Sequence, residues 1–208
     1  DVVRRKLGPP RIGHTGTLDP MADGMLIQLI GSATKQQQAF QGHDKVYEAT
    51  IRLGSQTDTG DATGTVVHEA PVPALTWAHV SDLLDSFNGA QVQTPPAYSA
   101  VKVRGRPAYW WARRHTPVAL SPRTIHLSEM TLVALQPETI TFRAHCSAGT
   151  YVRTVAEAIA QRLGTAGHVV RLIRLRVGAW HLDDARPLAW IRGAAPEEIV
   201  GSCKPCAS

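Results

Sequence analysis

Residues 13–24 combine two carboxylates with a loop that could present them to a ligand. The segment reads Gly-His-Thr-Gly-Thr-Leu-Asp-Pro-Met-Ala-Asp-Gly. Three glycines and an Asp-Pro pair predict a tight loop, because this composition continues neither a helix nor a strand ladder. Asp19 lies in its middle and Asp23 at its end, and the apolar run 25–30 predicts a buried strand that holds the loop. One interpretation gives Asp19 a catalytic role; the other is that it caps its own turn.

Two short segments place a tyrosine close to a cation. Residues 45–47 read Lys-Val-Tyr, and residues 149–154 read Gly-Thr-Tyr-Val-Arg-Thr at the start of a predicted helix. A helix N-terminus favours anions, and Arg153 there could bind a carboxylate or a phosphate through two N–H groups. Taken singly, Tyr47 and Tyr151 are typical of core packing.

The segment 168–176 is basic, and at its end charged and apolar residues alternate. Arg174 and Arg176 fall on one predicted face, and Ile173 and Leu175 on the other. This pattern indicates either a stripe that contacts phosphates or a solvated strand face without a ligand. The formal net charge of +5, from 22 Lys and Arg against 17 acidic residues, suits a polyanionic partner.

Composition excludes several classes of protein. No apolar run reaches membrane-spanning length, so we expect no membrane segment. Three cysteines form no disulfide framework, which favours a reducing, cytoplasmic setting. Residues 58–64 carry part of a calcium-loop pattern without its later glutamate, and we interpret them as a solvated turn. Cys203 and Cys206 would supply half a zinc site; with no second pair, a disordered tail is the preferred interpretation, and we expect no metal.

The elements that must position these residues follow from periodicity and capping signals. Strands outnumber helices without regular alternation, which predicts an α+β domain with a mixed, mostly antiparallel sheet flanked by helices. We assign residues 1–192 to one domain and 193–208 to a short polar tail. The predicted helices are the segment ending at Leu7, 33–40 capped by Ser32, 76–87, 108–115 opened by Pro107, 151–163 and 183–191. The main predicted strands are 45–53, the hairpin 124–135 with 139–146, and 168–182.

Five motifs in order resemble the TruB family of tRNA pseudouridine synthases over nearly the whole chain, from Asp1 to about Ile191. They are Gly-His-Thr-Gly-Thr-Leu-Asp-Pro at 13–20, Lys-Val-Tyr at 45–47, Pro-Pro-Ala-Tyr-Ser-Ala-Val-Lys at 95–102, Gly-Thr-Tyr-Val-Arg-Thr at 149–154 and Gly-His-Val at 167–169. The resemblance implies the pseudouridine synthase fold. It also implies isomerisation, without a cofactor, of the T-loop uridine at position 55 of tRNA.

The resemblance implies roles for individual residues. Asp19 matches the family's catalytic aspartate, and Arg153 matches the arginine that pairs with it and would keep it ionised and oriented. Tyr47 matches the tyrosine that stacks on the flipped base, and His14 matches the histidine that contacts the displaced target nucleotide. Two further residues match the pocket wall: Tyr151 and Leu172.

The sequence also departs from the family pattern. Asp23 stands where a small hydroxyl residue is usual, and Ile173 where a second arginine is common. We expect the family's opening segment to be missing before Asp1 and no C-terminal RNA-binding domain to be present. We expect a monomer that binds tRNA without an obligatory protein partner. Five arginines are expected to contact the RNA backbone: Arg104, Arg106, Arg171, Arg174 and Arg176.

The implied chemistry needs one nucleophile, a flipped-out base and a site closed to water. Whether a carboxylate attacks the ribose C1′ or the base C6 stays open at this point. A non-catalytic RNA-binding or RNA-folding module with the same fold is the main alternative. A hydrolase that uses His14 and Asp19 is a weaker one, because no nucleophile with a matching base accompanies them.

Overall fold

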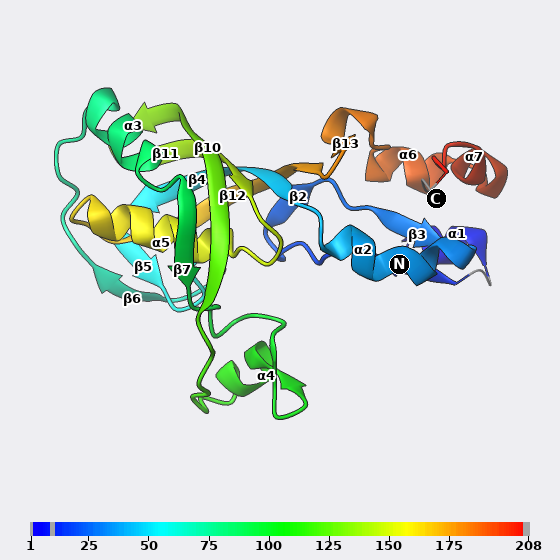
Figure 1. Ribbon diagram of the computed structural model, residues 1–208, viewed down its shortest axis with the longest axis horizontal. Coiled ribbons are helices and arrows are strands. Elements are labelled where there is room, and N and C mark those ends of the chain that lie inside the picture. The colour runs from blue at the N-terminus through cyan, green and yellow to red at the C-terminus, as the bar shows by residue number, and fades with distance from the viewer. Residues whose placement is uncertain (1, 9–10, 206–208) are drawn as a thin grey trace.

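The computed structural model describes residues 2–8 and 11–205 and has an α+β architecture (Figure 1). The helices are α1 (Val2–Leu7), α2 (Gln37–Gln41), α3 (Trp77–Asp85), α4 (Ala108–Ala112), α5 (Val152–Arg162), α6 (Leu188–Gly193) and α7 (Pro196–Gly201), with short 3₁₀ turns η1 (Gly31–Gln36) and η2 (Leu182–Asp184). The strands are β1 (Ile12–His14), β2 (Ala22–Gly24), β3 (Gln28–Ile30), β4 (Lys45–Leu53), β5 (Ser55–Thr57), β6 (Val66–Glu69), β7 (Gly89–Gln93), β8 (Lys102–Val103), β9 (Arg106–Pro107), β10 (Arg123–Gln136), β11 (Thr139–Cys146), β12 (Gly167–Val177) and β13 (Trp180–His181).

The central sheet has the strand order β13-β12-β4-β11-β10-β7, and each of these neighbours is antiparallel. Strand β2 joins it through a short parallel pairing with β12. Helices α3 and α5 pack against the sheet and share one apolar core with it, which includes Leu84, Ile159, Ile51 and Phe142. The predicted mixed, mostly antiparallel sheet flanked by helices is therefore confirmed.

Two parts of the chain extend from this core (Figure 1). One is an excursion between β7 and β10 that carries β8, β9 and α4. The other brings both ends of the chain together, with α1, β1, β3 and α2 on one side and α6 and α7 on the other. No helix in residues 2–8 and 11–205 is long and apolar enough to cross a membrane.

Strongly periodic elements match their predictions. Strand β4 has the predicted bounds, β10 and β11 form the predicted hairpin, and α5 lies within the predicted helix 151–163. Helix α3 begins after Thr76, whose hydroxyl accepts a hydrogen bond from the His79 N–H at 3.3 Å. Helix α4 is shorter than predicted, and Pro107 precedes it as the N-cap.

Several predictions around short segments are wrong. Residues 33–40 form η1 followed by α2, and because η1 starts at Gly31, Ser32 does not cap it. Residues 13–24 do continue a ladder at both ends, in β1 and β2, while the apolar run after them forms a strand only at β3.

The predicted strand 168–182 is also interrupted, because it turns at Gly178 between β12 and β13. The predicted polar tail contains α7, which buries Ile199. Cys206 lies outside the described residues.

Candidate active site

A two-pronged ion pair joins Asp19 to Arg153. The Arg153 Nε donates to Asp19 Oδ2 at 2.8 Å, and Nη2 donates to Oδ1 at 3.1 Å. The same guanidinium donates to the backbone carbonyls of Thr59 at 2.6 Å and Tyr98 at 2.9 Å. Only 5% of the Arg153 side chain is exposed, against 31% for Asp19. The guanidinium is thus held by hydrogen bonds to one carboxylate and two backbone carbonyls. The Asp19 carboxylate that it binds is still partly exposed to solvent.

The local folds explain how these distant residues meet. Asp19 lies in the loop between β1 and β2, where its carbonyl accepts a hydrogen bond from the Ala22 N–H at 2.9 Å. Strand β2 pairs in parallel with β12, the second strand from one edge of the central sheet. Arg153 lies in the first turn of α5, which packs on β12 and β4. Loop and helix therefore converge at the same edge of the core.

Asp19 and Arg153 line a cavity of about 820 Å³. All four tyrosines of the chain line it as well: Tyr47, Tyr98, Tyr109 and Tyr151. A cavity of this volume is in the range of small-molecule sites, and aromatic faces suit the stacking of a planar base. The site therefore combines a held carboxylate with aromatic walls.

Tyr47 and Tyr151 are held by different contacts. Tyr47 lies on β4, where burial raises the pKa of its hydroxyl and the neighbouring Arg174 guanidinium partly offsets that effect. Tyr151 is the N-cap residue of α5, and its backbone N–H donates to Gln93 Oε1 at 2.8 Å while its carbonyl accepts from Gln93 Nε2 at 3.0 Å. The Arg123 guanidinium lies over its ring, 4.9 Å from the centroid.

Asp61 is a site residue that the sequence analysis missed. It is only 3% exposed, and its Oδ2 lies 3.8 Å from Arg153 Nε. Its Oδ1 accepts hydrogen bonds from the Thr59 and Thr63 hydroxyls at 2.9 and 2.6 Å. The interpretation of residues 58–64 as a solvated turn is therefore wrong for Asp61. The density of Asp and Thr in this turn was the available signal.

Comparison with known proteins identifies the family. The profile of the TruB family pseudouridylate synthase N-terminal domain matches residues 4–152. The chain belongs to the TruB family. It is 45% identical to a tRNA pseudouridine synthase B of Opitutus terrae over 95% of this chain and 82% of that one, and 48% identical to one of Psychrobacter cryohalolentis over 86% of this chain. The prediction of a TruB-type pseudouridine synthase is confirmed at the level of the family.

Solved structures support the fold. The chain is similar to one in the crystal structure of a Cbf5-Nop10-Gar1 complex, with a TM-score of 0.71 and 23% identity over 98% of this chain. A chain of the archaeal box H/ACA sRNP Nop10-Cbf5 complex gives a TM-score of 0.66 with 21% identity over 92% of this chain. This chain spans 54% and 47% of those two chains, and 50% of the Psychrobacter relative.

One predicted RNA contact of this TruB family member is wrong. Arg174 is 1% exposed, and its guanidinium donates to the backbone carbonyls of Met25 at 2.7 Å and Gly16 at 3.2 Å. Register shifts between Val169 and Arg171, and between Arg174 and Arg176, break the alternation on which the predicted stripe depended. Arg174 therefore points into the protein and is not available to a phosphate at the surface.

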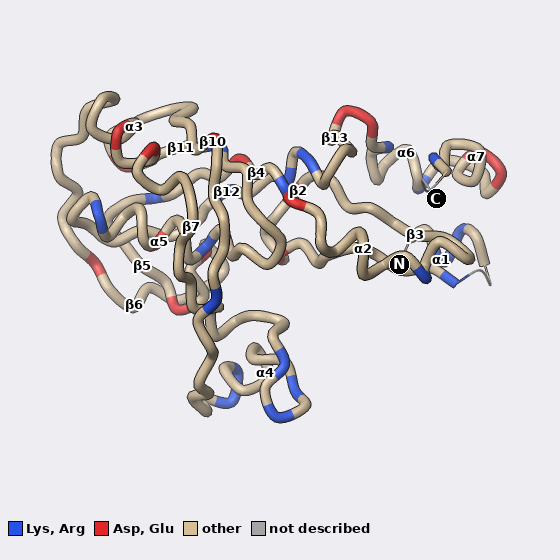
Figure 2. The backbone as a smooth tube through the Cα atoms, viewed as in Figure 1, with Lys and Arg blue, Asp and Glu red and all other residues tan. Residues whose placement is uncertain are grey.

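The remaining predicted site residues lie outside the cavity. His14 is exposed on β1 and is not among the residues that line the cavity. Leu172 is buried in the apolar core, next to Ala49 and Ala22 in the sheet register. Arg171 is exposed and lies 3.6 Å from Glu48, while Arg176 is half-buried. Arg104 and Arg106 are exposed on the α4 excursion, where cationic residues cluster (Figure 2).

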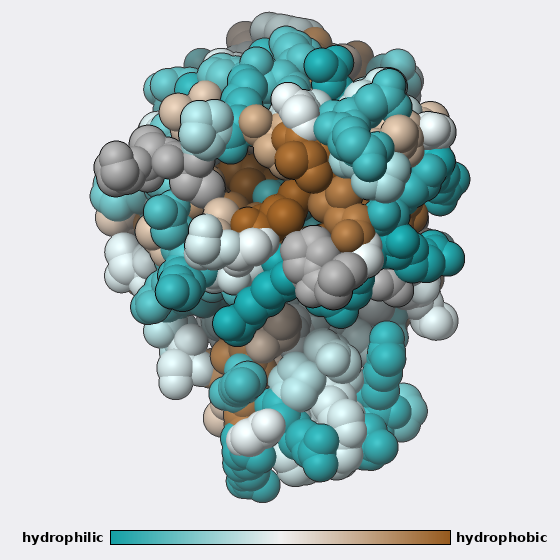
Figure 3. Space-filling view, turned by 90° about the vertical axis from the view of Figure 1, so that its right-hand side faces the viewer, coloured by the Kyte–Doolittle hydropathy of each residue, from teal (hydrophilic) through white to brown (hydrophobic). Residues whose placement is uncertain are grey.

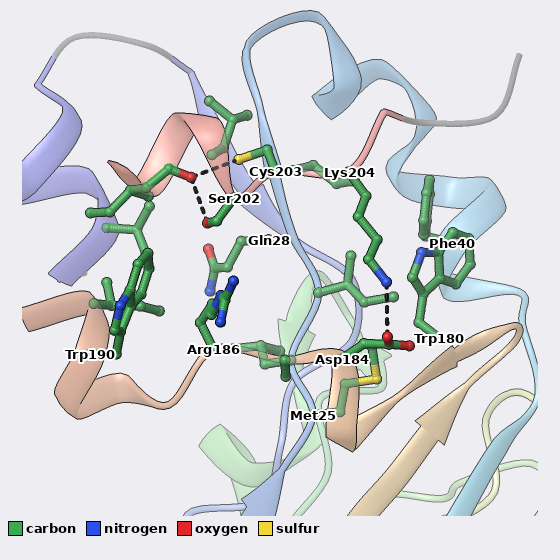
Figure 4. Close-up of a pocket in the computed structure, with 18 of the residues that line it drawn as sticks. Met25, Gln28, Phe40, Trp180, Asp184, Arg186, Trp190, Ser202, Cys203 and Lys204 are labelled. Atoms are coloured by element: carbon green, nitrogen blue, oxygen red, sulfur yellow. Dashed lines mark hydrogen bonds and ion pairs between the residues drawn. The ribbon is translucent and has the colours of Figure 1, made fainter. Parts of the chain in front are cut away.

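A second cavity, of about 240 Å³, lies between the two ends of the chain. Figure 3 views this end of the molecule and shows apolar side chains around a hollow. Figure 4 shows Met25, Phe40 and Trp180 in this pocket, with an ion pair of 3.0 Å between Asp184 and Lys204. Neither Asp19 nor Arg153 lines it. Within the part of the chain that the structure describes, no cluster of three metal-ligating side chains is present.

Proposed function

We propose that the chain binds tRNA and converts the uridine at position 55 of the T loop into pseudouridine, with Asp19 as the nucleophile. The observation that carries the proposal is the carboxylate of Asp19, held by Arg153 in a cavity walled by tyrosines. Membership of the TruB family and relatives named tRNA pseudouridine synthase B give the substrate class.

The reaction is an isomerisation. The bond between N1 of uracil and C1′ of ribose breaks, the base turns, and a bond between C5 and C1′ forms. The hydrogen on C5 leaves to solvent and N1 takes up a proton, so the atoms balance without an oxidant or reductant. Asp19 would act by adding to C1′ or to C6 and leaving again once the new bond has formed.

Arg153 and the aromatic walls would support this step. The two hydrogen bonds from Arg153 fix the direction of the Asp19 carboxylate, and the exposed part of that carboxylate faces the cavity. A T-loop uridine must leave its stack to reach such a cavity, and Tyr47 would take over its stacking. Tyr151, which also lines the cavity, would form a second aromatic wall.

Binding of the RNA would depend on cations outside the cavity. Arg104 and Arg106 are exposed on the α4 excursion, whose Tyr109 and Arg113 line the cavity. Arg171 and Arg176 on β12 would add further phosphate contacts. The proposal includes action in the cytoplasm as a monomer, with tRNA as the only macromolecular partner.

The direct test uses a T-arm transcript that carries tritium at C5 of its uridines. Isomerisation releases the tritium of the target uridine, so we expect about one equivalent per RNA at completion. A transcript with cytidine at position 55 and the other uridines unchanged is the matched control. Equal release from both transcripts would refute the choice of position 55. Binding of the transcript without any release would favour the non-catalytic RNA-binding module.

A further inference from the structure

Arg174 is the largest fully buried side chain of the described residues, and its place in the sheet is specific. It lies directly opposite Tyr47 in the antiparallel register of β12 and β4. Opposite residues of such a pair project on the same face of the sheet, so the guanidinium and the phenol are neighbours there. Both side chains line the cavity that contains Asp19.

The guanidinium also joins the two ends of the segment that carries Asp19. Nη2 donates to the Gly16 carbonyl at 3.2 Å, three residues before Asp19, and Nε donates to the Met25 carbonyl at 2.7 Å, six residues after it. The Arg174 backbone adds a third link, because its carbonyl accepts from the Met25 N–H at 2.9 Å. The loop is thus fastened at both ends to a single residue of the central sheet.

Gly24 allows this close fastening. Its φ of +102° favours glycine, and a Cβ at this position would overlap the backbone of Arg174. A buried arginine must find partners for its charge and donors, and here two carbonyls of the loop supply them. The contacts therefore couple the burial of Arg174 to one conformation of the loop.

We propose that Arg174 is a positioning residue of the isomerisation, which sets the place of Asp19 relative to Tyr47 by fastening the Gly16–Met25 loop to β12. The inference rests on the proposed function for its kinetic consequence. Displacement of a reacting group by about 1 Å can cost about 100-fold in rate, so the loss should appear in turnover rather than in RNA affinity.

The test compares Arg174→Met and Arg174→Lys with the wild-type chain. For Arg174→Met we expect kcat at saturating T-arm transcript to fall about 100-fold, with Kd for the RNA within about threefold of wild type. Arg174→Lys keeps the charge, but a single ammonium group cannot replace the two donors that bind the Gly16 and Met25 carbonyls. Its kcat should therefore lie between that of wild type and that of Arg174→Met. Arg52→Met, which removes an exposed arginine from neighbouring β4, should change neither constant.

Hydrogen exchange of peptides that cover residues 16–25 provides a second readout. Faster exchange confined to this loop in Arg174→Met supports the proposal, whereas a general increase would indicate only a loss of stability. If Arg174→Met does not fold, Arg174→Lys is judged by the same two measurements. Unchanged kcat in a folded variant, or a loss confined to Kd, overturns the proposal. If wild type releases no tritium, the proposed function is wrong, and the exchange experiment still decides whether Arg174 fastens the loop.

Discussion

The pair of Asp19 and Arg153 spans 134 positions of the chain and yet is held by short hydrogen bonds. Arg153 faces a second carboxylate, Asp61, whose Oδ2 lies near the guanidinium while its Oδ1 accepts hydrogen bonds from two threonine hydroxyls. A buried guanidinium between two carboxylates has its charge compensated on both sides, which lowers the cost of keeping it in the core. Both carboxylates line the cavity, and Asp19 is the more exposed of the two, with 31% of its side chain exposed against 4% for Asp61.

Substitutions of Tyr47 test whether an aromatic side chain in the cavity stacks on the flipped base. Tyr47→Ala should lower kcat/KM for a T-arm transcript by about 5- to 160-fold, because base–aromatic stacking is worth ~1–3 kcal/mol. Tyr47→Phe keeps the stacking face, and its kcat/KM should stay within about fivefold of wild type. Steady-state kinetics of tritium release give both values. If kcat/KM of the alanine variant equals that of wild type, Tyr47 serves only in packing and does not stack on the base.

At the scale of single residues, the sequence predicts those whose role is visible in a local motif. Asp19, Tyr47, Tyr151 and Arg153 stand in such motifs, and the structure brings all four to one cavity. The burial of the Arg174 side chain was not predictable from the alternation of charged and apolar residues in 173–176. It depends on register shifts in the pairing of β12 with β4. The burial of Asp61 depends likewise on long-range contacts with Arg153 and β12.

At the scale of elements, periodicity and caps predicted β4, the β10–β11 hairpin, α3 and α5, because each is long enough to show a repeating apolar face. Elements of two to six residues were predicted less well, although α1 ends at Leu7 as predicted. Strand β2 forms because it pairs with β12. The segment 33–40 has the apolar pattern of a single helix, but in the structure it is divided between the 3₁₀ turn η1 and α2. Such short elements are set by tertiary contacts, which outweigh local propensity.

The α4 excursion offers a test at this scale. Replacing Arg104 and Arg106 together by glutamine should flatten the slope of log Kd against log salt by up to ~2 units, at about 0.7–0.9 per phosphate contact. The rate at saturating RNA should change little, since backbone contacts position the substrate without touching the reacting base. Titration of tRNA at several salt concentrations measures the slope.

A matched pair on other surfaces controls for net charge. Arg52 and Arg192 are also exposed, and their double glutamine variant should leave the slope nearly as in wild type. Equal slopes for the two double variants would mean that the excursion makes no specific phosphate contact. The arginines of β12 are not substituted in this experiment, because Arg174 is buried.

At the scale of the whole molecule, the site sits where the loop before β2, the start of α5 and the α4 excursion meet beside the sheet (Figure 1). Stability and activity are therefore linked through α5, whose buried face carries both the core residues and Arg153. One turn after Arg153, Glu157 lies partly buried, and burial raises the pKa of its carboxyl above the ordinary value despite the opposing effects of Arg153 and Gln56.

This raised pKa predicts a pH dependence of unfolding. A carboxyl with a higher pKa in the folded state stabilises the fold fully below its unfolded pKa, and the contribution is lost as pH rises through the folded pKa. The free energy of unfolding of Glu157→Gln should therefore improve relative to wild type as pH rises above 4.5. Urea unfolding between acidic and neutral pH measures the difference, with the exposed Glu129→Gln as control. A constant difference, or one of opposite sign, would contradict the assignment.

Single-turnover tritium release by Asp19→Asn decides whether Asp19 is the nucleophile. Asparagine keeps the size of the side chain but removes its negative charge, so we expect no release above background while Kd for the T-arm transcript stays within about threefold of wild type. Asp82→Asn, which makes the same exchange at an exposed position on α3, should react like wild type. A rate for Asp19→Asn within about tenfold of wild type, equal to ~1.4 kcal/mol, would contradict the account and leave Asp19 as a turn residue.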